Sequence, residues 1–159
     1  MPVKSTKYRF LKTTKNNPNA SKVTHNAQQT LNIIIDSILE KKGIDVVSLD
    51  LSNLQDAMAA YFVICEGNSP PQVRAIADNV LEKVKQLTGQ IPAAREGFGS
   101  LEWVLLDYLD IVVHVFHKNK RHVYQLEELW GDAAITTTYN PDGTQLIHKD
   151  HRISLPKAE

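Results

Sequence analysis

The sequence LEWVLLDYLDIVVHVFHKNKRHVYQLEELW, residues 101–130, decides the fold. Its first half contains two apolar runs, Leu101–Leu106 and Leu109–Phe116, separated by a short acidic turn. Each run is too short for a typical helix and is rich in Val, Ile and aromatic residues, so each predicts a β-strand. The turn at Asp107 makes the two strands an antiparallel hairpin, which leads into an aromatic-rich segment with helical character.

Both faces of this hairpin are largely apolar. By the two-residue period of a strand, Leu101, Trp103 and Leu105 share one face, while Val104 and Leu106 share the other. Strands of this kind are typical of a sheet that is covered on both sides. The hairpin therefore predicts a layered α/β domain.

The flanking sequence supplies the other elements of that domain. Apolar residues at helical spacing predict helices at about 24–42, 70–87 and 124–132. Short apolar runs predict strands at 46–51 and 61–65, and a short edge strand at 93–96 is left open. The expected fold is an α/β sandwich in which helices flank a mixed sheet of four to five strands.

The chain length and composition predict one globular domain with tails. The chain has 159 residues, 42% of them apolar, and this fits a single core spanning residues 24–132. Residues 133–159 are expected to form a peripheral extension, although Thr136–Thr138 could extend a strand. Residues 1–23 are expected to form a flexible basic arm, because six cations lie there without any acid: Lys4, Lys7, Arg9, Lys12, Lys15 and Lys22.

The sequence also indicates the cellular compartment. Cys65 is the one cysteine, so an internal disulfide or a multi-cysteine metal site is excluded. No stretch approaches the roughly 20 apolar residues of a membrane span, and the N-terminus lacks a secretory signal. We therefore expect a soluble cytoplasmic protein without membrane contact.

Two patterns suggest chemistry but have simpler structural explanations. Gly67-Asn68-Ser69 lies between a strand and a helix, where amides favour an anion, and with Asp107 and Asp110 it is reminiscent of nucleotidyltransferases. The aspartates, however, are three positions apart across a turn, so a helix cap beside a hairpin turn explains the pattern equally simply. No metal is expected at the histidines, because those at 114 and 117 leave opposite strand faces.

The aromatic residues Trp103, Tyr124 and Trp130 are a stronger signal for binding. Trp and Tyr are enriched at interaction hot spots, although each could equally belong to the core. Because Val104 and Leu106 can pack under the helix of residues 70–87, the opposite face of the strand is left available. We therefore expect Trp103 to be an exposed interface anchor.

Several ordered motifs together resemble a known family. The motifs AYFVICEGNSPPQVRAIADNV, REG, EWVLLD, DIVVHVF and RHVYQLEELW, within residues 60–130, are similar to those of the ribosomal silencing factor family, also called RsfS or Iojap. The resemblance implies a nucleotidyltransferase-like topology without the enzymatic activity and without a cofactor. It implies a translational repressor that binds ribosomal protein number fourteen of the large subunit. Joining of the small subunit is then blocked, chiefly under nutrient limitation.

The resemblance also implies a set of interface residues and a homodimer in the free state. Carried over by position, the interface residues are Trp103, Asp107, Asp110, Tyr124, Leu126, Glu127 and Trp130. Two positions depart from the family pattern. Ala60 stands where Asp is common, and Leu109 stands in the hairpin turn where Gly is favoured. A positive φ is costly for Leu, so we expect the turn to be altered or strained.

Three functions remain to be separated. The leading hypothesis is a repressor without enzymatic activity that acts by occlusion, with the basic arm contacting ribosomal RNA phosphates or remaining a solvated tail. The alternative is a nucleotidyltransferase-like enzyme or nucleotide-binding protein that uses Gly67–Ser69 and the two aspartates. The third is an adaptor that acts away from ribosomes.

Overall fold

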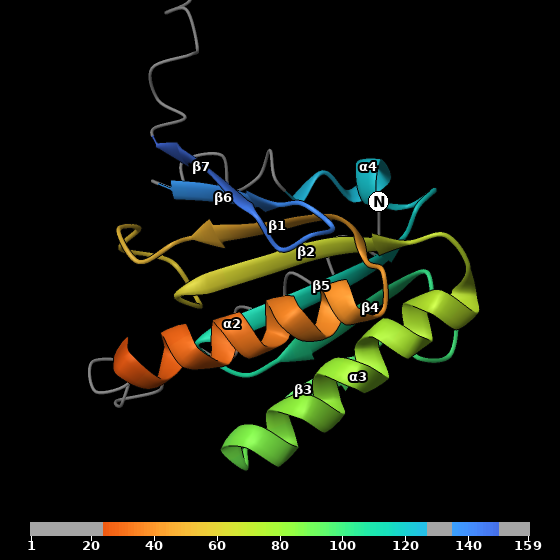
Figure 1. The fold of residues 1–159 in the computed structure, drawn as a ribbon, viewed down its shortest axis with the longest axis horizontal. Coiled ribbons are helices and arrows are strands. Elements are labelled where there is room, and N and C mark those ends of the chain that lie inside the picture. The colour runs from red at the N-terminus through yellow and green to blue at the C-terminus, as the bar shows by residue number, and fades with distance from the viewer. Residues whose placement is uncertain (1–23, 127–134, 150–159) are drawn as a thin grey trace, which may run out of the picture.

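A computed structural model describes residues 24–126 and 135–149 of this protein. These residues form one seven-stranded mixed sheet with two long helices against it (Figure 1). The strand order is β3-β4-β5-β2-β1-β6-β7, and every neighbouring pair is antiparallel except β2 and β5. The expected layered α/β architecture is thus confirmed.

Along the described chain, each helix is followed by two or three strands. The helices are α2 (Thr24–Glu40), α3 (Pro70–Thr88) and the short α4 (Arg121–Tyr124). The strands are β1 (Ile44–Asp50), β2 (Tyr61–Gly67), β3 (Ala94–Glu96), β4 (Trp103–Asp107), β5 (Ile111–His117), β6 (Ile135–Tyr139) and β7 (Gln145–Lys149). The helices within the described ranges include none that is long and apolar enough to cross a membrane.

Helix α3 begins and ends at the residues that its sequence predicts. Ser69 is the N-cap, and its hydroxyl accepts a hydrogen bond from the amide of Gln72 at 3.3 Å. A proline in the first turn is tolerated because its missing N–H would have no partner there. Gly89 ends the helix with φ 74°, a conformation in which a glycine has no Cβ penalty.

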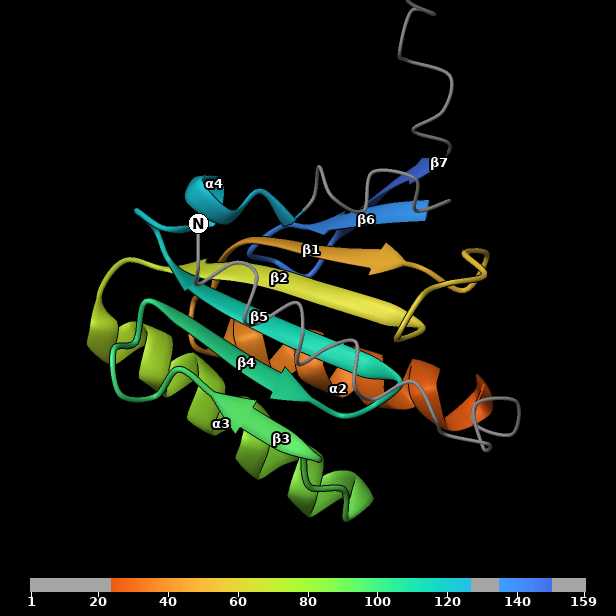
Figure 2. The ribbon, with the colours of Figure 1, turned by 180° about the vertical axis from the view of Figure 1, so that it is seen from behind.

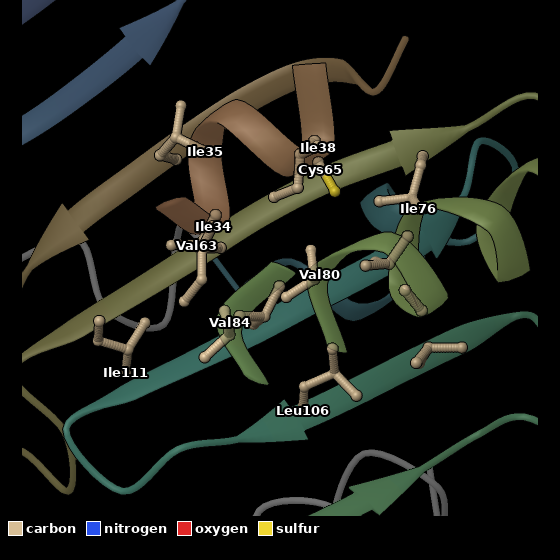
Figure 3. Packing of buried hydrophobic residues seen from close by; sticks show 14 of the residues in the cluster. Ile34, Ile35, Ile38, Val63, Cys65, Ile76, Val80, Val84, Leu106 and Ile111 are labelled. Atoms are coloured by element: carbon tan, nitrogen blue, oxygen red, sulfur yellow. The ribbon is translucent and has the colours of Figure 1, made fainter. Parts of the chain in front are cut away.

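Helices α2 and α3 cover the same face of the sheet, and the main core lies between them (Figures 1 and 3). Ile34 and Ile38 of α2 and Val80 of α3 meet Val63 and Leu106 of the sheet in this cluster. Val104 and Leu106 belong to it, which confirms the predicted parity of β4. The buried amide of Asn79 also ties the helices together by donating to the carbonyl of Ser37 at 2.8 Å.

The expected number of strands is wrong, because the sheet has seven strands where four to five were predicted. The edge strand β3 is present at Ala94–Glu96, and two further strands come from the segment expected to be peripheral. β6 pairs with β1 from Val46↔Tyr139 to Asp50↔Ile135. Its sequence, ITTTY, lacks the apolar run that marks a strand. β6 lies near the edge of the sheet and is held largely by its pairing with β1 and β7, so it needs no such run.

The helix predicted at 124–132 also differs from the observed one. Helix α4 ends at Tyr124, where the prediction had a helix begin, and Gln125 follows it with φ 47°. A residue in this left-handed conformation interrupts a helix, so a continuous helix from Tyr124 is wrong. The rest of the predicted helix, residues 127–132, lies outside the described residues.

Candidate functional site

Figure 2 shows the sheet from the side opposite α2 and α3. A second buried cluster lies on this face. Trp103 and Leu105 of β4, Phe62 of β2 and Phe116 of β5 meet in it with Leu126. These strand residues share a face because side chains alternate along each strand. Since the two long helices lie on the other face, this face holds the aromatic residues that the sequence singled out.

Trp103 lies inside this cluster, and the expectation that it is exposed is wrong. Its side chain is 2% exposed, so it is a core residue of the described structure. The ring centroids of Trp103 and Tyr124 are 4.4 Å apart, and those of Trp103 and Phe116 are 5.0 Å apart. Parity correctly assigned the face of Trp103 but could not show which side chains cover that face. Its place in a binding interface stays a prediction.

A buried hydrogen bond fixes the orientation of the indole ring. The Nε1–H group of Trp103 donates to Nδ1 of His114 at 3.1 Å. This bond requires Nδ1 of His114 to be unprotonated, so the imidazole acts as an acceptor in the core. Sequence reasoning treated His114 as a packed histidine or a metal candidate and missed this role. Leu105 of β4 pairs with His114 of β5, and Trp103 lies on the same face of β4 as Leu105. This register therefore places the rings of Trp103 and His114 on one face of the sheet.

Helix α4 is held beside this cluster by an ion pair. The guanidinium of Arg121 lies 3.4 Å from the carboxylate of Glu66 on β2, and it donates to the carbonyl of Asp45 at 2.6 Å. The Arg121 and Glu66 side chains are only 11% and 16% exposed, so the pair is largely shielded from water. Arg121 thereby anchors the helix whose last residue, Tyr124, packs its tilted ring against Trp103.

The acidic turn between β4 and β5 is a second part of the candidate site. Asp107 is 1% exposed; its Oδ1 accepts a hydrogen bond from the amide of Leu109 at 2.8 Å, and its Oδ2 has no partner among the described residues. Desolvation by burial raises the pKa of Asp107, and it also raises the pKa of the half-buried Asp110. The turn therefore carries two carboxylates whose charged form is disfavoured by burial.

The structure brings together only some of the residues carried over from the family. Trp103, Tyr124 and Leu126 belong to one cluster. Asp107 lies on the same face of β4 as Trp103 but four residues further along, a separation of about 13 Å. Asp110 lies in the turn beyond it. Glu127, Trp130 and the cations of the basic arm lie outside the described residues.

The parts of the alternative nucleotide site lie at opposite ends of the sheet. β2 and β5 are parallel, with Tyr61 paired to Ile111 and Gly67 paired to His117. The six steps between these pairs separate the Gly67 turn from the Asp110 turn by about 20 Å. A phosphate held at the first turn is thus out of reach of the carboxylates at the second.

The sequence of the Gly67 turn has a packing explanation instead. A Cβ atom on Gly67 would lie 2.9 Å from a methyl group of Val73 and 3.0 Å from its amide nitrogen, so only glycine fits between β2 and α3. The amide of Asn68 donates to the side chain of Gln72 at 2.7 Å, and Ser69 caps the helix. These internal partners account for the glycine and serine.

The histidines and the cysteine are also explained by packing. His114 is buried in the aromatic cluster, while His117 and His122 are partly or fully exposed. Within residues 24–126 and 135–149, no three His, Cys, Asp or Glu side chains are grouped closely enough to hold a metal ion. Cys65 is fully buried in the main core, and burial raises the pKa of its thiol to about 12, which disfavours the reactive thiolate.

Comparisons with known proteins agree with this fold and with the motifs. The family model described as "Ribosomal silencing factor during starvation" matches residues 24–157. A ribosomal silencing factor of Halalkalibacterium halodurans is 44% identical over 106 residues, covering 67% of this chain and 89% of that protein. The one from Bacillus subtilis is 41% identical over 110 residues, covering 69% of this chain and 92% of that protein.

A solved structure is also similar to this chain in fold and in sequence. A crystal structure of a Chromobacterium violaceum protein superposes with a TM-score of 0.62 at 36% identity, covering 65% of this chain and 85% of that one. The two proteins are therefore similar in sequence as well as in fold.

Proposed function

The chain belongs to the ribosomal silencing factor family, and from this premise we propose that it represses translation by binding the large ribosomal subunit. The proposed contact is ribosomal protein number fourteen, on the surface that meets the small subunit. Two bodies cannot occupy one surface, so the bound factor keeps the small subunit from joining. We propose that it acts in the cytoplasm, chiefly when nutrients are limiting.

The observation that carries this proposal is the family match across residues 24–157, which contains both parts of the candidate site. The aromatic part, around Trp103 and Tyr124, supplies a rigid platform on the face that α2 and α3 leave uncovered. Tyr124 is only half-buried and can reach a partner. Rigid aromatic side chains lose little conformational entropy on binding, which suits them to a docking surface.

The acidic part of the site supports a basic protein partner. The raised pKa values of Asp107 and Asp110 reflect a desolvation cost that a nearby cation would offset. Ribosomal protein surfaces that face RNA-rich surroundings are commonly basic, so such cations are available there. Charge pairs across an interface raise the association rate and fix the orientation of the partners.

Sedimentation with purified subunits tests the proposal. The protein is expected to sediment with large subunits in the absence of nucleotide and to reduce the fraction of joined ribosomes. Asp110→Asn is expected to weaken this binding, whereas Asp78→Asn on the exposed face of α3 makes the same charge change as a control. Sedimentation with neither subunit would refute the proposal and favour an adaptor that acts elsewhere.

An ATP titration with magnesium separates the repressor from the enzyme alternative. Saturable nucleotide binding that Asp107→Ala weakens would favour a nucleotide-binding protein. We expect no such binding, because the Gly67 and Asp110 turns are about 20 Å apart.

Two further contacts belong to the proposal. The basic arm, residues 1–23, is proposed to contact ribosomal RNA, and the free protein is proposed to form a homodimer. The outer edge of β7 suits a dimer contact, because β7 ends the sheet within the described residues and exposes Leu146 by 57% and Ile147 by 52%. An apolar edge strand of this kind readily pairs with another chain.

A further inference from the structure

Leu109, at the tip of the β4–β5 turn, adopts a backbone conformation that leucine normally avoids. Its φ angle is 73°, in the left-handed region that favours glycine, asparagine and aspartate. The strain expected at this position is therefore present. Strained residues persist where the surrounding structure imposes the conformation, and they gather at functional sites.

The hydrogen bonds around the turn impose this conformation. Oδ1 of Asp107 accepts from the Leu109 amide at 2.8 Å. The carbonyl of Asp110 accepts from the amides of Ala60 at 2.8 Å and Tyr61 at 3.0 Å, which ties the turn to the segment before β2. The backbone of Leu109 is thus fixed from both sides, and its side chain is held in one direction.

Packing within the protein does not explain why a leucine occupies this position. Leu101 also has a positive φ, 56°, but its side chain is half-buried and packs against the main core. The Leu109 side chain is 36% exposed and belongs to neither hydrophobic cluster of the described residues. The strain at Leu101 is offset by packing, whereas neither hydrophobic cluster of residues 24–126 and 135–149 offers such compensation at Leu109.

The surroundings of Leu109 indicate the chemistry of a partner. Three connecting segments, 51–60, 89–93 and 107–110, meet at this end of the sheet. Backbone hydrogen bonds join them: the amide of Ala93 donates to the carbonyl of Asp107 and the amide of Ala60 donates to the carbonyl of Asp110, each with an N···O distance of 2.8 Å. These segments contain neither lysine nor arginine but three aspartates, of which Asp56 is exposed, Asp110 is half-buried and Asp107 is buried. Ile91, in one of them, is 70% exposed. An apolar tip within an acidic rim repels phosphate and fits a protein surface in which cations surround an apolar patch.

We infer that Leu109 is an affinity-determining contact, presented by the strained turn to a basic protein surface of the large subunit. The inference rests on the proposed function and adds to it a residue at which this chain differs from the family's usual glycine. Because hydrogen bonds already hold the backbone of the turn, little backbone freedom is lost when the partner covers Leu109.

Four variants test this inference, with thermal melting and affinity for large subunits measured on each. Leu109→Asn and Leu109→Gly tolerate the left-handed conformation, so they are expected to melt at the wild-type temperature or above while affinity falls about fivefold or more. Leu109→Met is apolar and is expected to keep most of the affinity. Leu101→Asn is the matched control, and it is expected to lower the melting temperature because Leu101 packs on the core.

The outcomes distinguish this inference from the proposed function. Wild-type protein that fails to bind large subunits refutes the proposed function and the inference with it. Wild-type protein that binds, together with Leu109→Asn that binds equally well, refutes the inference alone. A fall in the melting temperature of Leu109→Asn would show a packing role, and a change confined to self-association would assign Leu109 to a dimer contact. Either result also overturns the inference.

Discussion

Replacing Trp103 by alanine is expected to destabilise the protein strongly, because the indole is a core residue. The side chain is 2% exposed, and its ring contacts those of Phe116 and Tyr124. The substitution removes these contacts, leaves a cavity in the second cluster, and takes the Nε1–H donor away from Nδ1 of His114. Each of these losses lowers the free energy of unfolding.

The size of the effect follows from the buried area. A buried aromatic side chain of this kind removes about 150–250 Å² from water. At about 25 cal/mol per Å² this corresponds to about 4–6 kcal/mol. The alanine side chain still contributes a small part of this burial energy. We therefore expect the free energy of unfolding to fall by about 3–5 kcal/mol, in line with Trp→Ala substitutions in other cores. Against a typical total of about 5–15 kcal/mol, this is about a fifth or more of the stability.

Urea unfolding followed by circular dichroism measures this loss. Circular dichroism is preferred to fluorescence because the chain has two tryptophans and the variant lacks one of them. Trp103→Phe is the matched control: it keeps an aromatic ring against Phe116 and Tyr124 but loses the bond to His114, so it is expected to cost about 1–2 kcal/mol. A loss below about 1 kcal/mol for Trp103→Ala would refute the buried assignment and restore Trp103 as an exposed anchor. Binding by the folded Trp103→Phe variant, rather than by the alanine variant, is the fair test of an interface role.

Three further predictions concern the turn, the arm and the sheet edge. Burial raises the pKa of Asp107 in the folded protein, so the folded state holds this proton more tightly and the stability that Asp107 contributes falls as pH rises through that pKa. Asp107→Asn should therefore be more stable than wild type at neutral pH, with the difference shrinking as pH falls towards 4; a difference independent of pH in urea unfolding would contradict this. Deleting residues 1–22, which carry six cations and no acid, should weaken binding to large subunits and flatten its dependence on salt, and an unchanged salt slope would show that the arm does not contact RNA. Ile147→Lys on the exposed edge strand β7 should shift the free protein from dimer to monomer in light scattering without lowering its melting temperature, whereas a variant that stays dimeric would place the dimer contact elsewhere.

The opposite ends of the sheet explain why a nucleotidyltransferase-like topology need not keep nucleotide chemistry here. The glycine-serine turn and the aspartates both survive in the sequence, but each has an internal structural role. Gly67 allows close packing of α3, Ser69 caps that helix, and Asp107 holds the amide of Leu109.

The sequence by itself determined the local features of this protein. The two-residue alternation in β4 correctly assigned Val104 and Leu106 to the helix-covered face, and Ser69 and Gly89 correctly marked the ends of α3. The leucine at position 109, where the resemblance implies a glycine, predicted an altered or strained turn, and its φ of 73° shows the strain. These features depend on residues within a few positions of one another, so their causes can be read directly from the chain.

Only the tertiary structure decided which elements meet and what covers each face. Alternation gives the face on which Trp103 lies, but the neighbours that bury it, Phe116 and Tyr124, come from elements that follow later in the chain. In the same way, β6 is a strand because β1 offers it a partner about 90 residues earlier in the chain, and its threonine-rich sequence gives little sign of this. Periodicity along a chain fixes the direction of a side chain, whereas burial and pairing depend on contacts between residues distant in sequence.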